Sequence, residues 1–525
     1  MSTASGCSSS TRFPLTERQN NLFSPLITVC LLLAAVTCGA QLVRTKSYEV
    51  ALTGENETRQ VLRAGDDHLM VYKPFLQNGR LMINYSVLDT ALQETLSGGI
   101  DFGNDQSIQL ARFGARRMWF LTRFIDKSRD FGIYGVFMDS TIYTYSRFLN
   151  VIPFQPLFFE ANGSAAVIAG YYNNRPVALF CNFRTGESKL LPGFFNLPGE
   201  VNQVTAYADG KFEVLLVLKT SGYRKSAYLN RYGPDGELEK STVVGSGKDR
   251  SLIFARQVRT GSDSMVIAGI YGNRSETSRG FFIAAVNADD TYTLRFYNYG
   301  DLPNFFKFLR PGRQERIRDR IERKKSRGKP LRFPHRMLVH DLAVHDNRLV
   351  LLAEAFFPTY RSSAGGVIRQ GSTGIFTYIK PFYPYQRDLV FDGFRYTHGI
   401  ALGISRSGTI QWDNSLTLRN IKTFNLQQFI QYVQGADNGY LLYATEDDIA
   451  GSMIRGSELT GFAGKDPGKQ RNDARMPSVE PGRNRIFSWY GNTLIQSGIR
   501  EVRREVVPGQ TSNMLIFQIT RLSAR

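Results

Sequence analysis

Short runs of apolar residues recur along the chain with a spacing of about 49 residues. The stretch from Ala166 to Arg175 reads AVIAGYYNNR, and it returns almost unchanged as MVIAGIYGNR from Met265 to Arg274, 99 positions later. Runs of the same kind begin near five further positions: Leu69, Met118, Leu216, Leu351 and Leu441. Short continuous apolar runs are typical of buried β-strands, and seven of them in register indicate an internal repeat.

Each repeat also carries turn signals between strand-like runs. Examples are Arg184-Thr185-Gly186, Pro234-Asp235-Gly236, Asp289-Asp290 and Arg406-Ser407-Gly408. Three to four short strands in each period of roughly 40–50 residues are typical of the blade of a β-propeller. We therefore predict an all-β protein, a β-propeller of seven blades with about four strands each. Six or eight blades stay open because the first and last repeats are degenerate, and a solenoid is the second choice because its repeats are usually shorter.

One of these turns invites comparison with the nucleophile turn of serine hydrolases. That turn has the pattern G-x-S-x-G, in which glycines on both sides permit the strained backbone. In the stretch from Gly403, Ser407 stands where the second glycine is required, and Gly408 comes one residue late. A glycine that closes a short polar turn between two apolar runs predicts a β-hairpin instead.

The repeat is preceded by a leader-like segment and broken by three irregular stretches. Arg12 and Arg18 precede an apolar run that ends at Cys38 and is too short to span a bilayer, and small residues follow it. We expect residues 1–40 to be a signal peptide and residues 41–525 to form the propeller. Insertions are predicted at about 303–336 and 358–392, and a mobile polar loop at about 461–485.

Export accounts for the cysteine usage. Cleavage before Gln41 would remove three of the four cysteines and leave Cys181, which lies in an apolar run and is expected to be a buried thiol. We predict a periplasmic or outer-membrane-associated protein. A lipoprotein anchored at Cys38 is the weaker alternative, because the residues before that cysteine make a poor lipobox.

The chain is strongly basic, with a formal net charge of +19. Removal of residues 1–40 takes away Arg12, Arg18 and Glu17, so the exported chain would carry +18. An exported basic protein is expected to meet an envelope protein or an anionic surface or glycan, rather than nucleic acid. Contact with a membrane is expected to be peripheral at most, because no later segment is apolar for long enough to cross one.

The repeat resembles the propeller repeats of secreted and cell-envelope proteins from Bacteroidetes-type bacteria. In that group an apolar strand ending in Ala-Gly is followed by a second strand, an Asp-Gly turn and a strand that bears tryptophan. The matching pieces here run from Val266 to Gly269, from Phe281 to Val286, and from Ile410 to Trp412 after Gly408. The resemblance covers most of residues 42–520 and implies the fold, but it implies no particular activity.

Glu354 and His398 are the two weak catalytic candidates. Alignment of the repeats places Glu354 where Gly269 and Gly170 stand, so this carboxylate could project toward the propeller axis, with Tyr396 and His398 as neighbours. The simpler alternative is a buried carboxylate paired with an arginine such as Arg395.

We predict no metal site and no cofactor. His340 and His345 are five residues apart, which would place them on opposite faces of a strand, so metal binding is disfavoured.

The strongest candidate for partner binding is a basic insertion. Thirteen lysines and arginines lie between Lys307 and Arg336 against three acids, Glu315, Asp319 and Glu322. Pro311-Gly312 and Gly328-Lys329-Pro330 are typical punctuation for a helix between them. The candidate partner-binding residues are Arg313, Arg316, Arg320, Arg323, Lys324, Lys325 and Arg327. The alternative is a solvated helix without a partner.

Two functions compete at this stage. The favoured one is a non-enzymatic, exported binding module of the cell envelope, for which a place beside an outer-membrane secretion machine would be suitable. The other is a propeller enzyme that acts on glycans through acids at the central axis. Paired carboxylates converging on the axis would favour the enzyme, and a protruding basic patch would favour the binding module.

Overall fold

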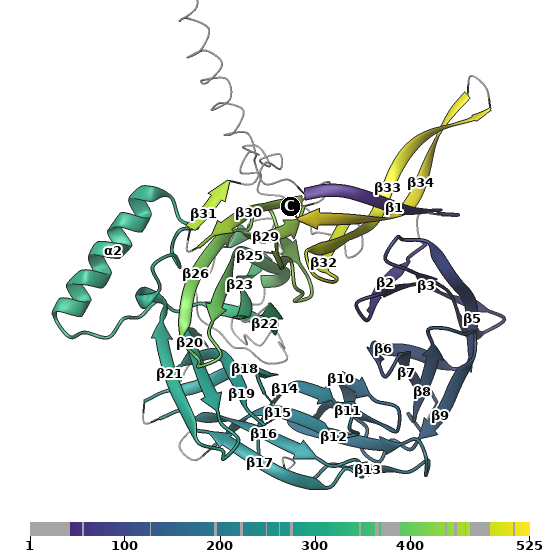
Figure 1. Cartoon of the computed structure of the whole chain (residues 1–525), viewed down its shortest axis with the longest axis horizontal. Helices are drawn as coiled ribbons and strands as arrows, with labels where there is room; N and C mark the ends of the chain where they lie inside the picture. Colours follow the sequence, from purple (N-terminus) through teal and green to yellow (C-terminus); the bar gives the residue numbers. More distant parts are fainter. Residues whose placement is uncertain are drawn as a thin grey trace, which may run out of the picture.

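The computed structural model describes residues 42–524, except for 363–366, 369–388, 462–483 and short turn segments. The turn segments are 55–56, 127, 194–196, 221–223, 248, 262, 274–276, 346–347, 436–437, 446–448, 457 and 508–509. The predicted signal peptide, most of the insertion at 358–392 and most of the loop at 461–485 therefore lie outside the described residues. The described residues form eight antiparallel sheets arranged around a central axis, which makes the fold a β-propeller (Figure 1).

The eight blades succeed one another in chain order around the axis (Figure 1). In blades 1 to 7, the first strand lies nearest the axis and the later strands lie progressively farther out. Blade 1 comprises β2 (Gln60–Ala64), β3 (His68–Gln77), β4 (Arg80–Leu88) and β5 (Glu94–Asn104). Blade 2 comprises β6 (Gln106–Gly114), β7 (Arg117–Phe124), β8 (Phe131–Phe137) and β9 (Tyr143–Phe148). Blade 3 comprises β10 (Gln155–Ala161), β11 (Ala165–Tyr172), β12 (Arg175–Asn182) and β13 (Ser188–Leu190). Blade 4 comprises β14 (Gly199–Ala206), β15 (Phe212–Lys219), β16 (Lys225–Tyr232) and β17 (Leu238–Val244).

The second half of the ring holds the larger excursions. Blade 5 comprises β18 (Ser251–Arg259), β19 (Met265–Gly272), β20 (Ser278–Val286) and β21 (Tyr292–Asn298). The short helix η2 (Tyr299–Asp301) and the helix α2 (Pro311–Ser326) follow it. Blade 6 comprises β22 (Arg336–His345), β23 (Arg348–Ser362), β25 (Leu389–Ile404) and β26 (Ile410–Thr417), with β24 (Val367–Ile368) and β27 (Lys422–Thr423) at its side. Blade 7 comprises β28 (Ile430–Gln434), β29 (Gly439–Ala444), β30 (Ile449–Arg455) and β31 (Glu458–Gly461).

Blade 8 closes the ring with strands from both ends of the described chain. It comprises β32 (Asn484–Ser488), β33 (Thr493–Val507), β34 (Gln510–Ala524) and, outermost, β1 (Leu42–Ala51). Strand β1 pairs antiparallel with β34 from Leu42↔Ala524 to Ala51↔Ile516. Unfolding of the ring therefore requires the N-terminal strand to leave its C-terminal partner.

The prediction of a β-propeller is confirmed, and the prediction of seven blades is wrong. All seven apolar runs found in the sequence are the second strands of blades 1 to 7. The eighth second strand, β33, begins TLIQSGIREV and has no comparable apolar run. Its blade also lacks a contiguous sequence repeat, because its outermost strand comes from the other end of the chain.

The hydrophobic core is divided among the gaps between blades. Eight clusters of buried side chains each join two neighbouring blades, including Trp489 and Phe517 of blade 8 with Leu69 and Val71 of blade 1. The middle strands are covered on both faces, which explains why they read as continuous apolar runs rather than alternating ones.

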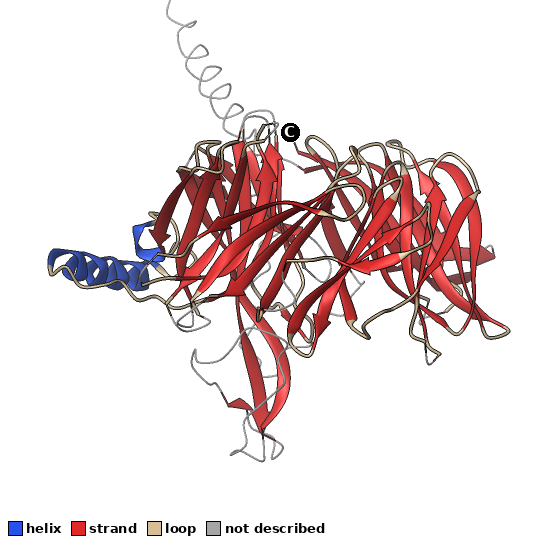
Figure 2. Ribbon diagram, turned by 90° about the horizontal axis from the view of Figure 1, so that it is seen from below, coloured by secondary structure: helices blue, strands red, loops and turns tan. Residues whose placement is uncertain are grey.

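Two hairpins and one helix leave the ring. The long strands β23 and β25 extend past one face of the propeller (Figure 2), and the tip of β33 and β34 projects outward (Figure 1). Helix α2 projects from the outer rim (Figure 2). Among the described residues, no helix has the length and apolar character needed to cross a bilayer.

Candidate functional site

Helix α2 confirms the predicted helix in the basic insertion and is tied to the rim along one side. Pro311 stands at its first position, and Gly328, with a φ of 59°, follows its last residues. Ile317 and Ile321 pack against the core between blades 5 and 6, beside Leu331 and Phe333. These two isoleucines give the helix one apolar side, which faces the protein's own rim.

Polar contacts fix the same side of the helix. The amide Nε2 of Gln314 donates to the Leu309 carbonyl at 2.6 Å, and Nζ of Lys325 lies 2.8 Å from a carboxylate oxygen of Asp301. No residue of α2 is fully buried, so the helix is held at the surface without being part of the core.

Apart from Arg318 and Lys325, the basic side chains from Arg313 to Arg327 gather on one flank of α2. Residues three or four positions apart share a side of a helix, and this spacing links six cations. We name them the cationic stripe: Arg313, Arg316, Arg320, Arg323, Lys324 and Arg327. All but Lys324 are exposed, while the acids Glu315, Asp319 and Glu322 belong to a different flank. Sixteen residues give α2 a length of about 24 Å, so the stripe is a straight row of charge.

The predicted partner-binding set is therefore brought together with one exception. Lys325 lies off the stripe and is used in the ion pair with Asp301. Three members of the stripe have further contacts: Arg320 lies over the ring of Phe333, Arg323 donates to the Asp319 carbonyl, and Lys324 donates to the Pro330 carbonyl. The other cations keep their charge at the surface.

Glu354 does not project toward the axis. It lies on β23, the second strand of blade 6, and its side chain is fully buried. One carboxylate oxygen accepts hydrogen bonds from the backbone N–H groups of Phe429 and Ile430, at 2.8 and 2.6 Å. Glu354 does occupy the same place in its blade as Gly170 and Gly269. That place is on the second strand of the blade, however, and not on the innermost strand that lines the axis. The other predicted arrangement, an ion pair between Glu354 and Arg395, is not formed either. The side chain that contacts the Glu354 carboxylate is the imidazole of His340.

His398 is a buried member of an aromatic cluster. Its ring stacks on Phe308 with centroids 3.6 Å apart and meets His335 edge to face at 5.5 Å. Its Nδ1 is 2.9 Å from the hydroxyl of Thr397. Burial, together with the nearby His335, holds the pKa of His398 well below its ordinary value. The ring of His398 is fully buried, so this structure gives the predicted catalytic role no support.

The other histidines form no metal constellation in the described part of the chain. His340 contacts Glu354 and His345 meets the ring of Tyr432. No group of three or more histidine, cysteine, aspartate or glutamate side chains is placed to hold a metal ion among the described residues.

A polar cluster at the inner strands was missed by the sequence analysis. The first strands of blades 2 to 5 each have a bulge near their start. The residue three positions after the bulge is Arg112 in β6, Glu160 in β10, Thr205 in β14 and Arg256 in β18. These four residues hold equivalent places in blades 2 to 5. Arg112, Glu160 and Arg256 are separated by 48 and 96 residues, close to one and two periods, and that spacing could have found them.

Two ion pairs connect this level of the ring. Nε of Arg112 lies 3.5 Å from Glu160, and Nε of Arg256 lies 3.2 Å from Asp341 on β22. Arg256 also donates to the backbone carbonyl of Asn202. We name Arg112, Glu160, Arg256 and Asp341 the axial cluster. It places two carboxylates and two guanidinium groups together.

The two carboxylates of the axial cluster differ in environment. Burial raises the pKa of Glu160 to about 7, with Arg112 opposing the shift and the charge of Asp341 adding to it. The side chain of Asp341 is 86% exposed. The cluster therefore holds one carboxyl, that of Glu160, which is partly protonated near neutral pH, and one exposed acidic side chain, that of Asp341.

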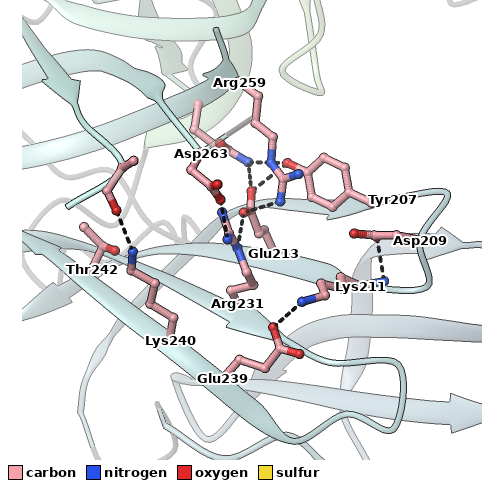
Figure 3. A network of polar contacts seen from close by, with 12 residues as sticks. Tyr207, Asp209, Lys211, Glu213, Arg231, Glu239, Lys240, Thr242, Arg259 and Asp263 are labelled. Carbon is pink, nitrogen blue, oxygen red and sulfur yellow. Dashed lines mark hydrogen bonds and ion pairs between the residues drawn. The ribbon is translucent and has the colours of Figure 1, made fainter. Parts of the chain in front are cut away.

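A second polar network serves the structure rather than a ligand (Figure 3). Glu213 is buried on β15 and accepts hydrogen bonds from Arg231 at 3.0 Å, Arg259 at 2.8 Å and the Tyr207 hydroxyl at 2.6 Å. Burial alone would raise the pKa of Glu213, but Tyr207 and the two arginines outweigh it and hold the pKa below its ordinary value. The network joins blade 4 to blade 5.

Comparisons with known proteins give only distant structural likenesses. No protein-family model matches the sequence, and no curated protein sequence matches it. Among solved structures, polysaccharide lyase Uly1 is similar at a TM-score of 0.36 and 9% identity, over 80% of this chain and 91% of the lyase. The β-propeller domain of the Trilobed protease from Pyrococcus furiosus is similar at a TM-score of 0.34 and 8% identity, over 77% of this chain and 97% of that domain.

A further similar structure matches less than half of this chain. A mutant of the Synechocystis apocarotenoid oxygenase is similar at a TM-score of 0.29 and 8% identity, over 45% of this chain and 60% of the oxygenase. The chain thus spans less than two thirds of that enzyme. At these scores and identities, none of the likenesses carries an argument.

Proposed function

We propose that the protein is a non-enzymatic binding module of the cell envelope that holds an anionic glycan on the cationic stripe of α2. The observation that carries this proposal is the placement of the stripe. Five exposed arginines stand in a row on a helix that the rim holds in place but does not cover. Pre-ordered arginines at fixed spacing suit sulfate and carboxylate groups repeated along a polymer.

A glycan fits this surface better than a folded acidic protein does. Protein interfaces have a core of aromatic and aliphatic side chains surrounded by a polar rim. The apolar residues of α2, Ile317 and Ile321, are packed against the protein's own Leu331 and Phe333 and are not available to a partner. What remains on the outer side is charge without an apolar centre. The envelope location follows from the leader-like segment and stays part of the proposal.

The test compares two variants that lose the same charge. The stripe variant replaces Arg313, Arg316, Arg320, Arg323 and Arg327 with Gln, and the control variant replaces Lys46, Arg116, Arg175, Arg184 and Arg455 with Gln. Binding to an immobilised sulfated polysaccharide should weaken at least about tenfold in the stripe variant and much less in the control. Equal loss in both variants would mean that net charge alone drives binding, and the proposal would then fail.

An enzyme that acts on glycans is the second candidate, and the axial cluster is the observation that favours it. A carboxyl with a pKa of about 7, such as Glu160, can donate a proton to a leaving oxygen at neutral pH. Asp341 supplies an exposed carboxylate at the same site, and Arg112 and Arg256 supply positive charge. This proposal moves the acids of the glycan-enzyme hypothesis from Glu354 to Glu160 and Asp341.

The two candidates are separated by one substitution. If the protein cleaves a glycan, Glu160→Gln should abolish release of new chain ends from a panel of acidic polysaccharides without loss of folding. If the stripe hypothesis is right, wild-type protein should release none, and Glu160→Gln should bind the sulfated polysaccharide like the wild type.

A further inference from the structure

A pocket lies between blade 5 and a hairpin of blade 6. It has a volume of about 380 Å³, within the usual range for small-molecule sites. One wall comes from the turns of blade 5, with Thr260, Ser264, Asn287 and Thr293. The opposite wall is the turn between β25 and β26, with Arg406 and Ser407. Figure 1 shows that these blades are neighbours in the ring.

The wall from blade 6 is fixed by contacts across the blade boundary. Nη1 of Arg295, on β21, donates to the backbone carbonyls of Ser407 at 2.7 Å and Gly408 at 3.4 Å. Gly408 has a φ of 77° and lies so close to blade 5 that an added Cβ would be 3.2 Å from Ala285 and Ile283. The positive φ favours glycine in this turn, and the close approach leaves little room for a side chain, so the turn is held in place against blade 5.

The charge of the pocket is positive and uncompensated by its walls. Arg295 and Arg406 both line it, and no described residue that lines it is acidic. Three acids of blade 5 are close in sequence to lining residues and have other partners: Asp263 lies 3.3 Å from Arg231, Asp290 lies 2.9 Å from Lys240, and Asp289 accepts from the hydroxyl of Thr291. Figure 3 shows Asp263 and Lys240 within the polar network of blade 4. A guanidinium has five N–H donors, so Arg295 has donors to spare beyond the two carbonyls that Nη1 contacts.

We propose that this pocket binds a single anionic sugar unit, with a carboxylate or sulfate group on Arg295 and Arg406 and its hydroxyl groups on the polar wall. Thr260, Ser264, Asn287 and Thr293 offer the hydroxyl and amide groups that hydrogen-bond to a sugar, and the side chains of Met265 and Val286 provide an apolar surface for its ring. Arginine is the side chain best suited to carboxylate and sulfate, because its donors match two oxygens at once. The site is separate from α2 and does not rest on the proposed function.

The test uses glucuronate, glucose 6-sulfate and neutral glucose as probes, with binding followed by ligand-observed NMR. Both charged sugars, or one of them, should bind the wild-type protein, and glucose should bind much more weakly. Which charged sugar binds decides between carboxylate and sulfate. Arg406→Gln should weaken binding about tenfold or more.

The matched control is Arg184→Gln. Arg184 occupies the corresponding turn of blade 3, where Gly186 also has a positive φ of 75°. This variant, and the stripe variant of α2, should bind the charged sugars like the wild type. The proposal is overturned if neither charged sugar binds, if glucose binds equally well, or if Arg406→Gln and Arg184→Gln behave alike.

Discussion

The Nε2 atom of His340 lies 3.0 Å from the Oε2 atom of Glu354, inside the boundary between blades 6 and 7. The other carboxylate oxygen of Glu354 accepts the backbone N–H groups of Phe429 and Ile430, just where blade 7 begins. Glu354 thus takes up the backbone donors that the start of β28 would otherwise leave unpaired. A carboxylate bound in this way holds two blades together.

Replacement of Glu354 tests this structural role. Glu354→Ala should lower the free energy of unfolding by about 2–5 kcal/mol, because it leaves two backbone N–H groups and His340 buried without their partner. Glu354→Gln keeps one acceptor oxygen and should cost less. Urea unfolding followed by circular dichroism gives both values. Unchanged stability in Glu354→Ala would contradict the account.

Glu213 should be even more sensitive, because its removal leaves two cations facing each other. Glu213→Ala leaves Arg259 without its carboxylate partner and leaves Arg231 with only the half-exposed Asp263, at the boundary between blades 4 and 5, and a loss of about 3–5 kcal/mol is expected. The exposed ion pair of Lys189 with Glu237 is the control: Glu237→Ala should change stability by less than about 1 kcal/mol. Similar melting curves for the two variants would refute a structural role for the Glu213 network.

The buried histidines predict a loss of stability in mild acid. Burial lowers the pKa of His335 from its ordinary 6.5 to about 4, and burial together with the nearby His335 lowers the pKa of His398 well below its ordinary value. Between about pH 4 and pH 6.5 these histidines bind protons in the unfolded chain but not in the folded one. The free energy of unfolding should therefore fall as the pH falls from about 6.5 toward 4. His335 alone accounts for up to about 3 kcal/mol of this loss.

A variant with Phe at both positions separates this effect from general acid unfolding. Phenylalanine suits the aromatic surroundings of Phe305 and Phe308 but does not titrate. His335→Phe with His398→Phe should therefore flatten the stability profile between pH 6.5 and 4. A profile as steep as that of the wild type would show that other groups drive the acid transition.

Cys181 should report on unfolding. It is fully buried in the core between blades 2 and 3, and burial raises the pKa of its thiol. A thiol reagent should label it slowly in buffer and at once in denaturant. Rapid labelling of the folded protein would show that β12 opens locally, against the packing described above.

The fold could be predicted from sequence as far as its second strands are uniform. Strands such as the one that begins at Met265 are buried on both faces, so nearly all of their residues are apolar and the strands can be recognised in the sequence. Strand β33 has no such run, and β1 joins its blade from the far end of the chain, so the eighth blade left no regular signal. The same reasoning misplaced Glu354, because the strands that repeat most clearly are not those at the axis.

The candidate sites were predictable to different degrees. The punctuation by Pro311 and Gly328 and the row of arginines between them are local features, and α2 follows from them directly. The axial cluster and the pocket depend on contacts between blades, such as Arg256 with Asp341 or Arg295 with Ser407. These residues are brought together only by ring closure and by the exact position of bulges and turns.

The salt dependence of glycan binding tests the central claim most directly. The dissociation constant for the sulfated polysaccharide should be measured from low to high ionic strength for the wild type, the stripe variant and the charge-matched control. The account predicts tight binding that weakens steeply with salt in the wild type and in the control, and weak binding with a shallow salt dependence in the stripe variant. Identical affinities and salt slopes in all three proteins would contradict it, because the arginines of α2 would then have no part in binding.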